Sequence, residues 1–140
     1  MRSPVRFAVL NGAFALLCAV PAAAQDAAKH SAAAISDVDK AVIGTWEGKY
    51  TSDHAPSGAM RLTIARDSSL KVTSLEMAMG HGMQAMPVRK FTASSSEISW
   101  VQETMDQACQ TTAVLRDGQM KGAIVCGHAA ANFVLTKQSK

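Results

Sequence analysis

The sequence has few aromatic residues, which make up only 5% of its 140 residues. Beyond residue 24 these are Trp46, Tyr50, Phe91, Trp100 and Phe133. They are too few and too scattered to form the stacking platform on which single-stranded nucleic acids bind. We therefore predict no nucleic-acid partner.

Motifs of the common enzyme classes are also missing. The chain contains no G-x-S-x-G nucleophile elbow, no H-E-x-x-H zinc motif and no Walker-type Gly-rich loop. His54, His81 and His128 are isolated from one another, and no C-x-x-C motif indicates redox catalysis. We therefore predict a non-enzymatic protein without a resident cofactor.

The first 24 residues have the composition of a secretory signal peptide. Arg2 and Arg6 form a basic start, residues 7–20 are an apolar run too short to span a bilayer, and Pro21 precedes three alanines. Cleavage after Ala24 removes Cys18 and the two arginines, which lowers the net charge from +3 to +1. No later apolar stretch approaches the ~20 residues of a membrane helix. We predict an exported chain, periplasmic or secreted, without a membrane span.

The rest of the chain divides into a lead and a β domain. Residues 25–43 are an Ala-rich lead, in which Ser36 and Asp39 predict one capped helical turn. Over residues 44–137, apolar and polar side chains alternate at period two in short segments separated by turn residues. The predicted strands are residues 45–51, 59–65, 70–79, 86–93, 97–102, 108–116, 119–126 and 131–137. About eight such strands are typical of an antiparallel up-and-down β-barrel, with a β-sandwich as the runner-up.

The third predicted strand contains a change of parity. Leu70 and Val72 share one parity, whereas the apolar residues from Leu75 onward share the other. A β-bulge near Thr73 and Ser74 keeps both sets on the same face of the sheet, so we expect a bulge there.

An Asp-Gly dipeptide sets the register of the next-to-last strand pair. If Asp117 and Gly118 form a two-residue type I′ turn, the numbers of facing residues sum to 235, as 117 and 118 do. Cys109 then faces Cys126 in a non-hydrogen-bonded pair, with Cα atoms roughly 4.5 Å apart, which is close enough for a disulfide. In an oxidising compartment this geometry predicts a structural disulfide, worth about 3 kcal/mol of stability.

The segment Gly44-Thr45-Trp46-Glu47-Gly48 resembles the start of lipocalin-like, or calycin-type, barrels, where a helical turn leads into a G-x-W motif. The ending 132–137 is similar to the last strand of small exported bacterial barrels of unassigned function. The resemblance implies that Trp46 plugs the closed end of a barrel. An eight-stranded barrel holds packed side chains or one small ligand. If it encloses a ligand cavity, we expect Trp46 and Trp100 to form its walls.

The segment 76–86 is rich in methionine. Four side chains that suit copper share one parity in it: Met77, Met79, His81 and Met83. On an extended strand they lie on one side, and thioethers select Cu(I) while imidazole also suits copper. Two other interpretations stay open. The methionines can fill an irregular core, or Gly80 and Gly82 can turn the chain and leave His81 at a loop tip.

Three functional hypotheses follow. The leading one is an exported, non-enzymatic barrel that binds a small apolar molecule in its mouth, or an envelope protein through its loops. The first alternative is a periplasmic Cu(I) or Ag(I) binder that uses the methionine and histidine set, with copper as its metal. The second is an inhibitor of secreted proteases, an architectural analogy in which the lead 25–34 enters a protease cleft.

Overall fold

The computed structural model describes residues 37–139. It contains a short helix at residues 37–42 followed by nine strands. The strands are β1 (Gly44–Ser52), β2 (Gly58–Arg66), β3 (Leu70–Met79), β4 (Gly82–Ala85), β5 (Val88–Ala93), β6 (Glu97–Glu103), β7 (Ala108–Arg116), β8 (Gln119–Cys126) and β9 (Ala129–Lys137). The predicted signal peptide and most of the lead lie outside the described residues and stay predictions. Within residues 37–139, no helix has the length and apolar character needed to cross a membrane.

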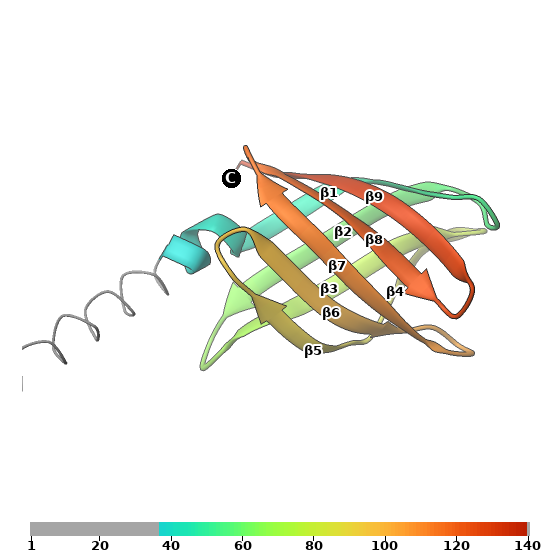
Figure 1. The fold of residues 1–140 in the computed structure, drawn as a ribbon, viewed down its shortest axis with the longest axis horizontal. Coiled ribbons are helices and arrows are strands. Elements are labelled where there is room, and N and C mark those ends of the chain that lie inside the picture. Colours follow the sequence, from blue (N-terminus) through green and yellow to red (C-terminus); the bar gives the residue numbers. More distant parts are fainter. Residues whose placement is uncertain (1–36, 140) are drawn as a thin grey trace, which may run out of the picture.

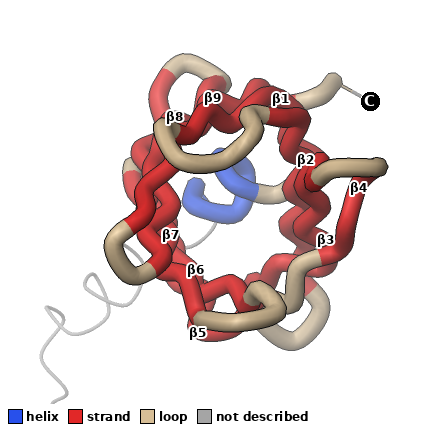
Figure 2. Tube along the Cα trace, turned by 90° about the vertical axis from the view of Figure 1, so that its right-hand side faces the viewer, coloured by secondary structure: helices blue, strands red, loops and turns tan. Residues whose placement is uncertain are grey.

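All nine strands belong to one antiparallel sheet, in the order β4-β3-β2-β1-β9-β8-β7-β6-β5. The first strand pairs with the last, and the sheet curls around a single core (Figures 1 and 2). Strands β4 and β5 form its two edges, and in the link between them the Met86 N–H donates to the Leu75 carbonyl of β3 at 2.8 Å. The predicted fold class, an all-β antiparallel barrel, is confirmed.

The predicted number of eight strands is corrected to nine. The chain turns at Gly80 and His81 and returns as β4, which pairs with the end of β3. Pro87, which has no backbone N–H, then separates β4 from β5. The sequence suggested one strand over residues 86–93 because four exposed residues in β4 show no apolar alternation.

The predicted bulge in β3 is confirmed. Thr63 pairs with Ser74, whereas its neighbour Ile64 pairs with Val72. Thr73 is therefore the extra residue, and it keeps the apolar side chains of both halves of β3 on the interior face.

The predicted hairpin and disulfide are confirmed as well. Asp117 and Gly118 have φ angles of 51° and 70°, as a type I′ turn requires. Strands β7 and β8 pair in the predicted register. Cys109 and Cys126 are bonded, with Cα atoms 4.4 Å apart.

The short helix closes one end of the barrel, and Figure 2 shows it within the outline of the strands. Val42 and Trp46 are buried in the core, and the Trp46 indole N–H donates to the Val42 carbonyl at 2.9 Å. Lys137 of β9 donates from Nζ to the carbonyls of Lys40 and Ala41, at 2.8 and 3.1 Å. Its Nζ also lies 5.5 Å from the centre of the Trp46 ring, a cation–π contact. Helix, first strand and last strand are thus joined at this end.

Candidate ligand cavity

A cavity of about 560 Å³ lies at the end of the barrel opposite the short helix. It is lined by the ends of β1, β3, β4, β6 and β8, by the start of β9, and by loops at this end. Its volume falls within the range of small-molecule sites, roughly 300–1,000 Å³. Chain connectivity explains the position, because the helix precedes β1 and fills only the end at which β1 begins.

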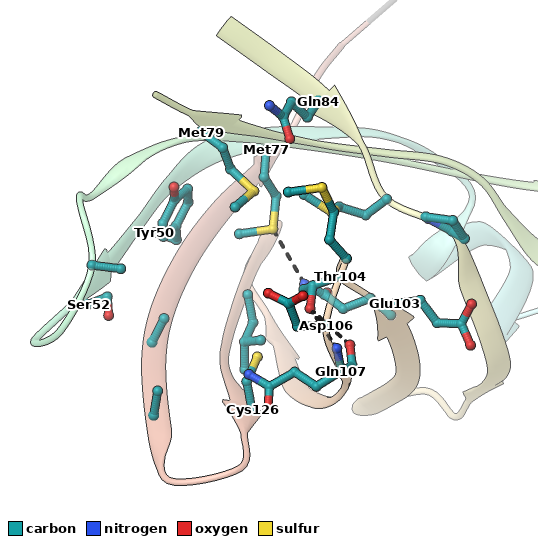
Figure 3. A pocket seen from close by; sticks show the side chains of 18 of the residues that line it. Tyr50, Ser52, Met77, Met79, Gln84, Glu103, Thr104, Asp106, Gln107 and Cys126 are labelled. Atoms are coloured by element: carbon teal, nitrogen blue, oxygen red, sulfur yellow. Dashed lines mark hydrogen bonds between the residues drawn. The ribbon is translucent and has the colours of Figure 1, made fainter. Parts of the chain in front are cut away.

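Four methionines give the cavity much of its apolar wall: Met77, Met79, Met86 and Met105. Met77 and Met86 are buried, Met79 is 41% exposed, and Met105 is almost fully exposed in the loop between β6 and β7. Figure 3 shows Met77 and Met79 on the same side of the cavity as Tyr50. Unbranched thioether side chains adapt to ligands of different shape, so this wall can adjust around an occupant.

The opposite wall consists of small residues next to the disulfide. Ala129, Ala130 and Ala131 line the cavity together with Cys126. Short side chains at the start of β9 leave the space that larger residues would fill. The bond to Cys109 holds this end of β8 against β7, so the disulfide also fixes the shape of the cavity.

A buried polar group lies at the floor of the cavity. Gln102, only 2% exposed, lines it from β6. Its Oε1 accepts hydrogen bonds from Trp100 Nε1 at 3.1 Å and from Thr111 Oγ1 at 3.2 Å. Its Nε2 donates to the Met77 sulfur at 3.4 Å, the contact that Figure 3 marks at Met77. These hydrogen bonds compensate for the cost of placing an amide in the core.

Tyr50 contributes the second polar contact of the wall. Its hydroxyl donates to the Ala78 carbonyl at 2.5 Å. Burial raises the pKa of the phenol above its ordinary value, because the phenolate would lose solvation. Tyr50 is therefore neutral at physiological pH and presents an aromatic face with its polar tip already paired.

The charged groups of the lining are acidic. Glu103 and Asp106 lie at the rim, and no Lys, Arg or His belongs to the lining found in the described part of the chain. Glu103 also pairs with Arg89 at 2.8 Å on the outer surface. The lining therefore provides no cation that could neutralise an anionic ligand.

Trp46 and Trp100, which the sequence suggested as cavity walls, lie instead in the packed interior. Both rings are fully buried, and neither belongs to the cavity lining. Trp46 occupies the closed end, whereas Trp100 packs 6.0 Å from Phe133 and holds Gln102 through its indole N–H. Trp100 thus acts on the cavity through Gln102, and a direct contact of either ring with a ligand stays a prediction.

The structure separates the predicted copper ligands. Met77 and Met79 line the cavity, but Met83 faces Ala78 across the β3–β4 hairpin and therefore lies on the other face of the sheet. His81 is exposed in the turn. The expectation that all four share one side of an extended strand is corrected, because the chain reverses after Gly80, whose φ is +61°. Among residues 37–139, no three His, Cys, Asp or Glu side chains are placed to hold a metal ion.

Sequence reasoning missed Gln102, Met86 and Met105 as cavity residues. A signal for Gln102 exists, because it shares the inward parity of Ile98 and Trp100, and a polar residue at such a position needs a partner or a role. Met105 has no comparable signal, since its place depends on how the loop folds over the end of the barrel.

Comparisons with known proteins support the fold. No protein-family model and no curated protein matches the sequence. A redesigned β-barrel, b11L5F_LGL, superimposes with a TM-score of 0.58 at 13% identity, covering 74% of this chain and 96% of that one. The wild-type fluorescent protein UnaG matches with a TM-score of 0.44 at 10% identity, covering 71% of this chain and 99% of that one. The likeness to the redesigned barrel, at 13% identity, shows a β-barrel fold and nothing about ligands.

Proposed function

We propose that this protein is an exported, non-enzymatic β-barrel that binds a small, mainly apolar molecule in the cavity at its open end. The observation that carries the proposal is the cavity of about 560 Å³, walled by methionine and alanine with one buried amide at its floor. Binding sites of this kind combine apolar walls with a few placed polar groups. The disulfide supports export, since such bonds persist in oxidising compartments.

A cavity-filling substitution tests this proposal. Nile red, a neutral dye whose fluorescence rises in apolar surroundings, serves as the probe. Ala131→Trp places a large ring in the cavity, because Ala131 lines it from β9. We expect saturable dye binding to the wild-type protein and at least a tenfold weaker affinity for Ala131→Trp.

The matched control is Thr136→Trp, an identical ring at an exposed position near the other end of the same strand. It should bind the dye as the wild-type protein does. Equal affinity for all three proteins would place the dye outside the cavity, and the absence of saturable binding to the wild-type protein would refute the proposal.

A second candidate function is binding of Cu(I) or Ag(I) by the thioethers that share the cavity. Met77, Met79, Met86 and Met105 line it together, a set the sequence identified only in part. Soft sulfur ligands select Cu(I). The test is an Ag(I) titration of the double variant Met79→Leu, Met105→Leu against Met83→Leu, which removes a thioether 45% exposed on the other face.

This candidate predicts one Ag(I) ion per chain, lost in the double variant and kept in Met83→Leu. Equal loss in both variants, or no uptake by the wild-type protein, refutes it. The protease-inhibitor hypothesis depends on residues 25–34, which lie outside the described residues, and stays a prediction. Binding of an envelope protein through the loops stays a prediction as well.

A further inference from the structure

The orientation of the Gln102 amide is fixed by its neighbours. The indole N–H of Trp100 can only donate, so the atom of Gln102 that it meets at 3.1 Å must be the carbonyl oxygen. The Thr111 hydroxyl, fully buried, donates to the same oxygen at 3.2 Å. A flipped amide would set its NH₂ group against the indole N–H, at the cost of a buried unpaired donor.

The fixed amide presents its nitrogen toward the cavity. Nε2 carries two N–H groups, and its partner in the structure is the sulfur of Met77 at 3.4 Å. A thioether is a weak acceptor, and Met77 itself lines the cavity with a flexible side chain. An oxygen acceptor on a ligand would therefore be a better partner for this amide than the thioether is.

The charges of the lining select against anions. Glu103 and Asp106 are its charged residues, and Arg89 meets Glu103 without lining the cavity. Glu103 is paired with Arg89 on the outer surface, which leaves Asp106 as the carboxylate at the rim. A carboxylate entering the site would lose its hydration and meet Asp106, with a neutral amide as its donor at the floor.

We infer that the cavity selects neutral apolar molecules that carry a hydrogen-bond acceptor, such as a ketone, ester or ether oxygen. This inference rests on the proposed function. Gln102 Nε2 donates to this acceptor, and the methionine wall packs against the apolar body. Trp100 and Thr111 are positioning residues, because they hold the amide with its nitrogen toward the ligand.

Three probes of nearly equal shape test the inference on the wild-type protein. They are 2-acetylnaphthalene, a neutral ketone; 2-isopropenylnaphthalene, in which a CH₂ group replaces the carbonyl oxygen; and 2-naphthoate, an anion. Affinities are measured by competition with Nile red. We expect the ketone to bind about three- to tenfold more tightly than the alkene, the effect of one hydrogen bond, and the anion to bind most weakly.

The outcomes separate this inference from the proposed function. Equal affinities of ketone and alkene, or tightest binding of 2-naphthoate, overturn the inference while the cavity remains a binding site. If Nile red and all three probes fail to bind, the proposed function falls and the inference falls with it.

Variants assign the donor. Gln102→Met removes the amide, and Gln119→Met is the matched control, because Gln119 is exposed on β8 and does not line the cavity. The preference for the ketone should vanish in the first variant and persist in the second. The reverse result contradicts the assignment.

A measurement on the wild-type protein keeps the inference testable if Gln102→Met does not fold. The side-chain amide of Gln102 gives its own NMR signal in ¹⁵N-labelled protein. 2-Acetylnaphthalene should shift this signal downfield, whereas 2-isopropenylnaphthalene should not. Indistinguishable shifts with the two probes would show that the amide makes no hydrogen bond to the ligand.

Discussion

Gly48 shows how one residue permits two strands to approach. It lies on β1 opposite Leu135 of β9, and a Cβ atom at this position would lie 1.9 Å from the Val134 carbonyl oxygen. The obstacle is backbone, so it cannot rotate away as a side chain can. The glycine of the Trp46-Glu47-Gly48 segment is thus required where the first and last strands pair.

We predict that Gly48→Ala lowers the free energy of unfolding by about 1–3 kcal/mol, the usual cost of overpacking. Urea denaturation followed by tryptophan fluorescence measures the change. Lys49→Ala, at the exposed neighbouring position of β1, is the control and should stay within about 0.5 kcal/mol of the wild-type protein. Equal stability of Gly48→Ala and Lys49→Ala would show that the strands can separate slightly without cost.

Lys137, at the closed end of the barrel, makes the free energy of unfolding depend on pH. Burial lowers the pKa of its ammonium below the ordinary 10.5. Between the folded-state pKa and 10.5 the unfolded chain binds more protons than the folded chain, so the free energy of unfolding rises with pH in that window. At lower pH both states are protonated, and the cost of burying the charge is fully present.

We therefore predict that the stability of the wild-type protein, measured relative to Lys137→Met, increases between pH 8 and pH 10.5. Urea unfolding of both proteins at several pH values gives this difference, in which the other titrating groups cancel. A difference that stays constant or falls over this range would show that the ammonium is not desolvated.

At the scale of elements, the turn of the β7–β8 hairpin determines both the strand register and the position of the disulfide. The Asp117-Gly118 turn fixes the pairing that brings Cys109 opposite Cys126, 17 residues apart in sequence. Replacing both cysteines by alanine should lower the free energy of unfolding by about 3 kcal/mol, since the unfolded chain loses a cross-link. Thermal or urea unfolding checks this, and the wild-type protein under strong reductant should lose a similar amount. Unchanged stability in both experiments would mean that hairpin contacts alone determine this end of the barrel.

The elements also show what a sequence can predict. The hairpin, the bulge at Thr73 and the disulfide depend on spacing and on alternation at period two, and the chain displays both. Strand β4 could not be recognised, because its four residues are all exposed and it exists only through pairing with β3. The cavity could not be predicted either, since Gln102, Met105 and Ala131 come together only when the sheet curls.

For the whole molecule, the two ends of the barrel differ in construction. The short helix, Val42 and Trp46 fill one end, whereas the other end holds the cavity and presents methionine side chains to it. A barrel closed at one end gives a ligand one route of entry. We therefore predict that ligand binding perturbs the end that holds the cavity and leaves the closed end unchanged.

NMR of methionine methyl groups tests this claim most directly, because methionines lie in both regions. On titration with 2-acetylnaphthalene, the methyl signals of Met77, Met79, Met86 and Met105 should shift. Those of Met120, buried in the core near the Asp117-Gly118 turn, and of Met83, on the other face of the sheet, should stay in place. Shifts confined to Met83, or no shift at any cavity methionine under saturating probe, would contradict the account.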